Sequence, residues 1–471
     1  MSDKLNVVVV VADTLRTAHM GCYGNPWIKT PALDRMAQQS IRFTRAYPES
    51  LPTIPVRRAL HTGRRAYPFR GYYMLKWGTV YLPGWQPIDE DEDTLAETLA
   101  QAGYQTGFGC TTQHCWNPGY TFERGFWQWE YVRGYSGEDR WRSPFSANRE
   151  EIAEFGDPDK IMERPHSRVP MTLSNRDGLM VDEKTATARL FKWGCEFLEA
   201  NQEQPFYLLL DSFAPHEPWE APKKYLDMYG DPKYDGLRTA WSTYGPADCY
   251  SQAEVEHIKA NYAGLVTHVD HWFGVFMDKL TELGLDKNTV VMFTSDHGTN
   301  FTDNPRNIIG KPEYSMYPGV MNLPLLIQLP NGKLAGETRD ELVYNIDMVA
   351  TVYDLVNQQS EQGIDGRTLM PLMGGEGQWQ TRDRVTCRYG HSVCYIDDEI
   401  WALTDVDGKP QDLFDLDGDP NCQTNIMEKA DRTLFQRAWK GILADADGEL
   451  PDYRGQWQTD AVGRAGIQKL P

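Results

Sequence analysis

Five consecutive valines near the amino terminus limit the folds open to this chain. The run Asn6-Val7-Val8-Val9-Val10-Val11-Ala12 leads directly to Asp13. Consecutive β-branched residues without polar alternation are typical of a strand buried on both faces, as in a parallel sheet covered by helices on each side. Residues 205–213 and 289–294 have the same character. We therefore expect an α/β fold built on a mostly parallel sheet.

Acidic and imidazole side chains stand where two of these strands end. Asp13 follows the first strand, and Asp296 and His297 follow the one that ends at Thr294. Ligands collect outside the carboxyl ends of strands in open α/β sheets, so the three side chains are expected to converge. Two carboxylates and an imidazole suit a divalent cation, and we predict one site for Ca²⁺, Mg²⁺, Mn²⁺ or Zn²⁺.

The segment from Thr53 to Gly63 is typical of a short helix. A proline stands two residues after Thr53, and Gly63 ends a run of helix-compatible residues. Thr53 would lie at the helix N-terminus, where unpaired N–H groups and the helix dipole stabilise an alkoxide and a bound anion. Arg57 can add a cation one turn further in. A simple Thr cap on a surface helix is the alternative, and the other motifs argue against it.

Six motifs occur in an order that resembles the sulfatases of the alkaline phosphatase superfamily. They cover nearly the whole chain and are, in chain order, Asp13-Thr14-Leu15-Arg16 with Gly21-Cys22-Tyr23-Gly24, Thr53-x-Pro55-x-Arg57 with Leu60-x-Thr62-Gly63-Arg64, Gly103-Tyr104-Gln105-Thr106, Pro215-His216-x-Pro218-Trp219, Thr294-Ser295-Asp296-His297-Gly298, and Asp412-Leu413-Phe414-Asp415. The resemblance implies a large mixed, mostly parallel sheet flanked by helices, with a small C-terminal α+β domain. On this division residues 1–370 form the catalytic domain and 371–471 an antiparallel-sheet subdomain.

The nucleophile position departs from the family. Family sulfatases carry Cys or Ser where this chain has Thr53, and that residue is oxidised to formylglycine, whose hydrate attacks the substrate. Threonine cannot give the aldehyde, because its Cβ carries a methyl group. Elsewhere in the superfamily, phosphodiesterases and phosphoethanolamine transferases use a metal-bound Thr directly. The resemblance therefore implies a metal-dependent hydrolase of a phosphoester or phosphonate ester, with Thr53 as both a metal ligand and the direct nucleophile. The alternatives are a sulfatase that acts without formylglycine and a non-catalytic anion-binding homologue.

Two other positions differ from the family pattern. Thr14 stands where many members have a second Asp, and we expect it to ligate the metal weakly or only to orient Asp13. A Lys and a His that contact the sulfate group follow the family's strand at residues 104–108. Here Thr111 lies nearest the Lys position, and His114 can substitute as a substrate contact. Loss of the cation favours a diester or phosphonate monoester over a doubly charged headgroup.

The remaining catalytic candidates are His216 and Lys311. His216 follows a buried strand, so we expect it to protonate the leaving group or contact the anion. Lys311 and Arg57 would balance charge on the substrate oxygens. Asp211, His216 and His391 would instead suit the second metal of a two-zinc phosphatase. We expect a single metal, because the overall pattern is sulfatase-like.

The net charge of the chain limits the classes of partner that it can bind. A net charge of -20 and a pI near 5.0 argue against nucleic acid or an anionic membrane surface, but not against a small anionic ester. The first core strand begins at once, so we expect no signal peptide. Eight cysteines without a C-x-x-C pair are most simply reduced thiols, and we expect a cytoplasmic protein.

Residues 115–185 are predicted to form a loop-rich insertion. They are rich in Trp, Tyr, Arg and Asp and show little periodicity. Long aromatic-rich loops often build the substrate pocket of an enzyme. An oligomer contact explains the same composition equally well, so a homo-oligomer remains open.

Overall fold

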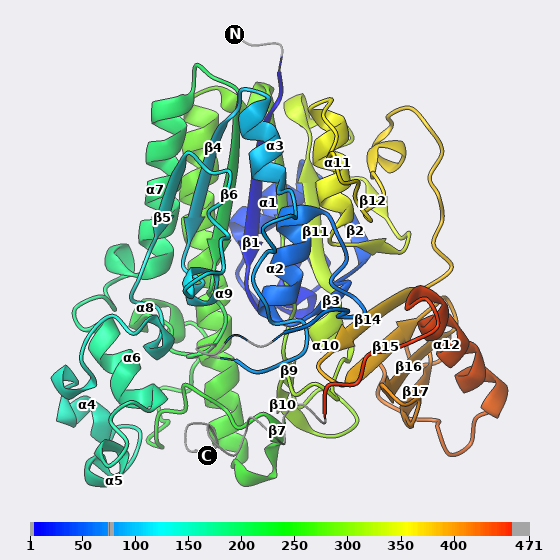
Figure 1. Ribbon diagram of the computed structural model, residues 1–471. Coiled ribbons are helices and arrows are strands. Elements are labelled where there is room, and N and C mark those ends of the chain that lie inside the picture. Colours follow the sequence, from blue (N-terminus) through cyan, green and yellow to red (C-terminus); the bar gives the residue numbers. More distant parts are fainter. Residues whose placement is uncertain (1–3, 74, 76–79, 455–471) are drawn as a thin grey trace.

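The central strand of the molecule is the valine run. The computed structural model describes residues 4–73, 75 and 80–454. In it β1 (Asn6–Ala12) pairs in parallel with β6 (Phe206–Ser212) on one side and β8 (Thr289–Thr294) on the other. Every residue of β1 is buried, so the prediction of a doubly covered α/β sheet is confirmed (Figure 1).

The main sheet has nine strands and is mixed. Its order is β12-β2-β11-β8-β1-β6-β4-β5, and β13 also pairs with β2. Only β11 runs antiparallel to its neighbours, which are β8 and β2. The other members are β2 (Ile41–Tyr47), β4 (Gln105–Cys110), β5 (Gln128–Tyr131), β11 (Leu323–Gln328), β12 (Thr338–Arg339) and β13 (Val343–Tyr344).

Alternate valines of β1 serve two separate hydrophobic cores. Val7, Val9 and Val11 pack with α2, α3 and α11, whereas Val8 and Val10 pack with α1, α7 and α9. Figure 1 shows these helices on the two faces of the sheet. Their bounds are α1 (Pro31–Gln38), α2 (Thr53–Thr62), α3 (Leu95–Gln101), α7 (Ala186–Asn201), α9 (Gln252–Glu282) and α11 (Asp347–Leu355); the short α8 (Lys223–Leu226) packs on α9 and α10 (Pro318–Met321) precedes β11.

A second sheet occupies the C-terminal part. Its order is β17-β16-β15-β14-β3, and α12 (Arg432–Asp445) packs on it. Four of its strands come from one stretch: β14 (Val385–Tyr389), β15 (Ser392–Ile396), β16 (Ile400–Asp405) and β17 (Pro410–Asp415). The fifth, β3 (Ser50–Leu51), comes from the N-terminal part and pairs in parallel with β14. The division at residue 370 stays a prediction, since this sheet joins residues from both sides of it.

The segment 115–185 contains helices as well as loops. It carries β5, α4 (Arg149–Ala153), α5 (Pro158–Met162) and α6 (Arg168–Arg176). The sequence predicted loops because these helices are too short to give a clear hydrophobic period. A further small sheet is formed by β7 (Gly245–Pro246), β10 (Ile308–Gly310) and β9 (Asn300–Phe301).

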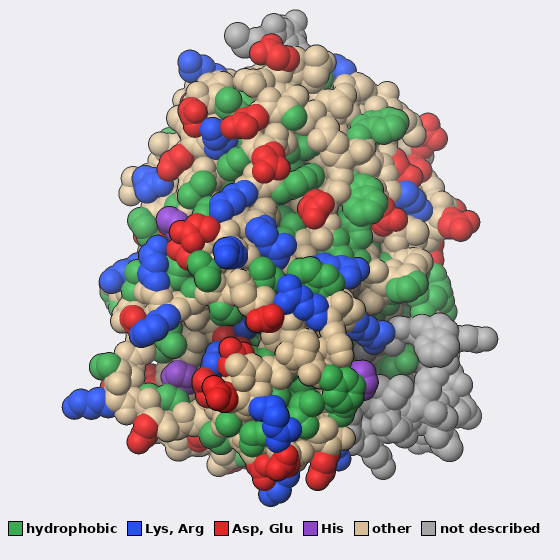
Figure 2. All heavy atoms as spheres, turned by 90° about the vertical axis from the view of Figure 1, so that its left-hand side faces the viewer, with side chains coloured by type: hydrophobic (Ala, Val, Ile, Leu, Met, Phe, Trp, Pro, Cys, Tyr) green, Lys and Arg blue, Asp and Glu red, His purple; other side chains and the backbone are tan. Residues whose placement is uncertain are grey.

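Charged side chains are numerous on the face that lies at the left of Figure 1. Acidic and basic side chains are interspersed there, and hydrophobic side chains form small patches between them (Figure 2). Among the described residues, no helix has the length and apolar character needed to cross a bilayer. All eight cysteines are free.

Candidate functional site

The predicted metal ligands lie together at the carboxyl edge of the main sheet. Val11 of β1 stands opposite Thr294 of β8, so the chain reaches Asp13 and Asp296 at the same level of two adjacent strands. Asp13, Asp296 and His297 are fully buried, and one ligand atom from each lies within 4.8 Å of the others.

Two of these ligand atoms have no hydrogen-bond partner within the described chain. They are His297 Nε2 and Asp13 Oδ2, and the latter forms an ion pair with Arg57 Nη2 at 3.0 Å. His297 Nδ1 lies 3.0 Å from the Gly298 carbonyl oxygen, which can only accept, so Nδ1 carries the proton and Nε2 presents a lone pair. Nε2 is 3.4 Å from Asp296 Oδ2. Burial and the Asp296 carboxylate raise the pKa of Asp13 well above its usual value. This donor set fits a divalent cation.

Thr14 orients the cluster. Its hydroxyl donates to Asp13 Oδ1 (2.7 Å), and its backbone N–H donates to Asp296 Oδ1 (3.0 Å). The backbone reaches this arrangement only with φ of 65°, a strained conformation for a β-branched residue. Strain of this kind persists only where the surroundings enforce it, and here both predicted carboxylate ligands depend on it.

The predicted helix after Thr53 is confirmed. Thr53 is the first residue of α2, and the helix stops at Gly63, which has φ of 71°. Thr53 is 3% exposed and lines a cavity of about 190 Å³. The hydroxyl therefore lies at a helix N-terminus within reach of a bound molecule.

Arg57 is placed differently from the expectation that it contacts the substrate. It does not line the cavity, and its guanidinium pairs with Asp211 (2.7 Å), Asp296 (2.6 Å) and Asp13 (3.0 Å). Burial disfavours the charge, yet these three carboxylates hold the pKa of Arg57 well above its usual value. The Arg57 guanidinium thus balances the negative charge of the predicted metal ligands.

The alternative second metal site and the expected Thr111 contact with the substrate do not assemble. Both oxygens of Asp211 accept from Arg57, and no metal-ligand group in the described chain joins Asp211 to His216 or His391. The Thr111 hydroxyl accepts the backbone N–H of Phe213 (2.6 Å), and Thr111 is absent from the cavity lining. Its hydroxyl is used to fix the end of β6.

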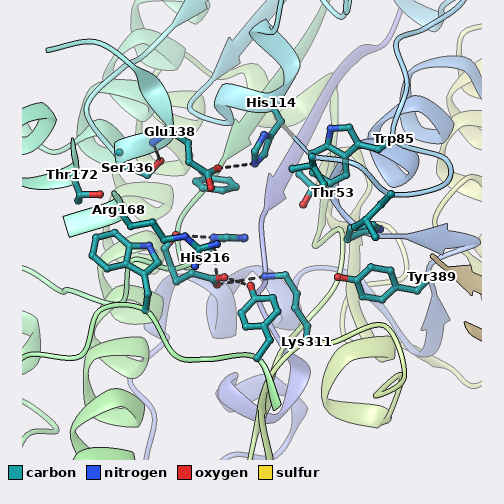
Figure 3. A pocket seen from close by; sticks show the side chains of 18 residues that line it. Thr53, Trp85, His114, Ser136, Glu138, Arg168, Thr172, His216, Lys311 and Tyr389 are labelled. Atoms are coloured by element: carbon teal, nitrogen blue, oxygen red, sulfur yellow. Dashed lines mark hydrogen bonds and ion pairs between the residues drawn. The ribbon is translucent and has the colours of Figure 1, made fainter. Parts of the chain in front are cut away.

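His216 and Lys311 line the cavity (Figure 3). Glu217 is a further lining residue. Glu217 Oε2 lies 3.3 Å from His216 Nδ1 and 3.4 Å from Lys311 Nζ, and Tyr244 donates to the other carboxylate oxygen. The backbone oxygen of Glu217 is 2.7 Å from His216 Nδ1, so that nitrogen carries the proton and Nε2 can accept one. Burial and Lys311 lower the pKa of His216 well below its usual value, which keeps the resting ring neutral.

His114 also lines the cavity, with a carboxylate partner that the sequence did not indicate. Its Nε2 lies 3.0 Å from Glu138 Oε2. Glu138 comes from the aromatic-rich segment, and Tyr389, another lining residue, comes from the C-terminal sheet. No sequence motif identifies either residue. The only sequence signal for Glu138 is the expectation that residues 115–185 contribute to a substrate pocket.

The mixed sheet, the acid–imidazole cluster and a hydroxyl at a helix N-terminus define a protein of the alkaline phosphatase superfamily. Within it the chain belongs to the sulfatase family. The family model described as Sulfatase matches residues 5–358, and the one described as N-sulphoglucosamine sulphohydrolase, C-terminal, matches residues 313–445.

Relatives with different printed activities are similar to this chain. The multifunctional alkaline phosphatase superfamily protein PehA of Trinickia caryophylli is 24% identical, covering 97% of this chain and 98% of that protein. The arylsulfatase of Clostridium perfringens is 25% identical over 96% of each chain. The phosphonate monoester hydrolase of Agrobacterium radiobacter has a similar structure, with a TM-score of 0.70 at 21% identity, covering 96% of this chain and 97% of that one. The family is a hydrolase family, and these similarities leave the ester class open.

Proposed function

We propose that this protein hydrolyses phosphate or phosphonate esters with the unmodified hydroxyl of Thr53 as nucleophile. The observation that carries the proposal is the position of that hydroxyl. Thr53 lines the cavity at a helix N-terminus, in the company of His216 and Lys311. A secondary alcohol needs activation by a base or a metal to attack; His216 is a base in the same cavity, and Asp13, Asp296 and His297 would hold a metal.

A divalent cation held by Asp13, Asp296 and His297 would supply a Lewis acid that lowers the pKa of the Thr53 hydroxyl and polarises the substrate. His216, neutral at rest, takes the hydroxyl proton on Nε2. The Thr53 oxygen forms a bond to phosphorus while the bond from phosphorus to the leaving oxygen breaks, and that oxygen takes the proton from His216.

The second half of the reaction reverses these roles. His216 takes a proton from water, the water oxygen bonds to phosphorus, the phosphorus–oxygen bond to Thr53 breaks, and the Thr53 oxygen takes the proton from His216. Lys311 and the α2 N-terminus stabilise negative charge on the non-bridging oxygens in both halves. Arg57 favours the ionised forms of the buried Asp13 and Asp296, although burial and the Asp296 carboxylate still hold the pKa of Asp13 above its usual value. The sum is ester plus water giving acid plus alcohol.

The test is the chemistry at residue 53. We expect rapid quenching with a p-nitrophenyl phosphonate or phosphodiester to leave a phosphoryl or phosphonyl group on Thr53, detected by peptide mass spectrometry. Thr53→Ala should lose at least 1000-fold in kcat, on the order of what removal of a nucleophile costs. Thr433→Ala, at an exposed position on α12, is the control.

A sulfate ester hydrolase is the competing function, and the arylsulfatase relative favours it. Turnover rates for p-nitrophenyl esters of phosphonate, phosphate and sulfate distinguish the two functions. If p-nitrophenyl sulfate is turned over faster than the phosphorus esters, the chain is a sulfatase. Turnover by Thr53→Ala within tenfold of the parent would remove Thr53 from the mechanism altogether.

A further inference from the structure

We propose that the ester cleaved at this site carries an ammonium group in its organic part, and that Glu138 binds it. The inference rests on the proposed function, because it names the substrate class of the same site. It starts from a carboxylate in the cavity wall whose charge the hydrolytic mechanism does not use.

One oxygen of Glu138 is available to a bound molecule. Oε2 accepts from Gln113 Nε2 (2.8 Å) and faces His114 Nε2 (3.0 Å). Oε1 accepts no hydrogen bond from any residue that the structure describes, and the side chain is 41% exposed while lining the cavity. Burial opposes ionisation, but His114 and Arg168 lower the pKa of Glu138 well below its usual value. The group is therefore an anion held in a fixed position.

Aromatic rings accompany this carboxylate. The indole of Trp85 meets His114 edge to face, with ring centroids 4.9 Å apart, and Trp241 lines the same cavity. An ammonium group is attracted by ring faces as well as by a carboxylate. The cavity volume of about 190 Å³ is close to that of a cavity of roughly 150 Å³ that holds benzene, so it suits a small substrate.

The charged residues that line the cavity suit a zwitterionic substrate, with an anionic ester at one end and a cationic group at the other. In Figure 3 Glu138 and His114 lie above the cavity centre, and Lys311 lies below it. Lys311 suits the anionic ester, and Glu138 suits a cation on the same molecule. Arg168 also lines the cavity; it is exposed and forms no ion pair with a described acidic residue, and its charge favours the ionised form of Glu138.

Three matched diesters test the inference: p-nitrophenyl phosphate carrying a 2-aminoethyl, a propyl or a 2-carboxyethyl group. We expect kcat/KM to be about tenfold higher for the aminoethyl ester than for the propyl ester, as a hydrogen bond to a charged group would give. In Glu138→Gln this ratio should fall to near one, while the amide still accepts from His114. Glu150→Gln, exposed on α4, should keep the parent ratio.

Other results would overturn the inference. Equal rates for the three esters, or a preference for the carboxyethyl ester, would show that Glu138 does not select the substrate. An equal loss on all three in Glu138→Gln would mean that Glu138 only positions His114. Calorimetric binding of 2-aminoethylphosphonate against propylphosphonate tests the same preference without turnover. A failure of Thr53 catalysis is thereby separated from a failure of this inference.

Discussion

Replacement of Arg57 by Met is the sharpest test of how the ligand cluster is stabilised. Arg57 is 1% exposed and pairs with Asp211, Asp296 and Asp13 at 2.6–3.0 Å. Removing one partner of a buried ion pair costs about 3–5 kcal/mol, because the other charge stays buried and unpaired. Here three carboxylates lose one cation, so we expect a loss near the upper end, about 5 kcal/mol, in the metal-free protein.

Arg57→Lys separates charge from geometry. Lysine keeps the cation but cannot reproduce the two-pronged contact with Asp211, so we expect a smaller loss of about 1.5–3 kcal/mol. Unfolding by denaturant in the presence of EDTA, followed by tryptophan fluorescence, measures both. Arg437→Met is the control, since that arginine also pairs with two carboxylates but is 40% exposed, and we expect at most about 1 kcal/mol. A loss for Arg57→Met no larger than that of the control would refute the reasoning.

Two further predictions concern the metal ligands and a buried acid. Divalent ions should stabilise the parent protein by about 2.7 kcal/mol at an ion concentration of 100 Kd, and His297→Ala should remove most of this stabilisation. The imidazole ligand should favour Mn²⁺ or Zn²⁺ over Ca²⁺. Thermal unfolding titrated with each ion measures both effects, and an unchanged response in the variant would contradict the assignment. Asp270 accepts the backbone N–H groups of Ala32 (3.1 Å) and Leu33 (2.7 Å), and burial raises its pKa to about 7. The folded state therefore binds this proton more tightly than the unfolded state. The free energy of unfolding of the parent, relative to that of Asp270→Asn, should fall between about pH 4 and pH 7, by at most about 1.4 kcal/mol per pH unit. A difference between the two proteins that is constant over this range would contradict the assignment.

Elements with strong local signals could be predicted from the sequence. A capping box at Ser251 opens α9, with the Ser251 hydroxyl accepting from Glu254 N–H. The valine run became the central strand, and the chain positions of Asp13 and Asp296 at strand ends sufficed to bring them together. These predictions succeed because periodicity, caps and strand ends are local properties.

Features that depend on tertiary neighbours could not be predicted. The antiparallel direction of β11 follows from how the chain returns to the sheet, which its own residues do not encode. Arg57 was expected at the substrate because it lies one turn from Thr53, but its orientation is decided by carboxylates that are distant in the chain. Glu138 joins the cavity from a segment without periodicity, so only its composition gave a hint.

The pairing of β3 with β14 has a consequence for when the protein becomes active. Ser50 and Leu51 pair with Arg388 and Tyr389, and Thr53 follows two residues later. A ribosome must therefore have made the chain beyond Tyr389 before the strand that precedes the nucleophile finds its partner. Hydrolytic competence should emerge late in translation, and a released N-terminal fragment would lack it even with every metal ligand present.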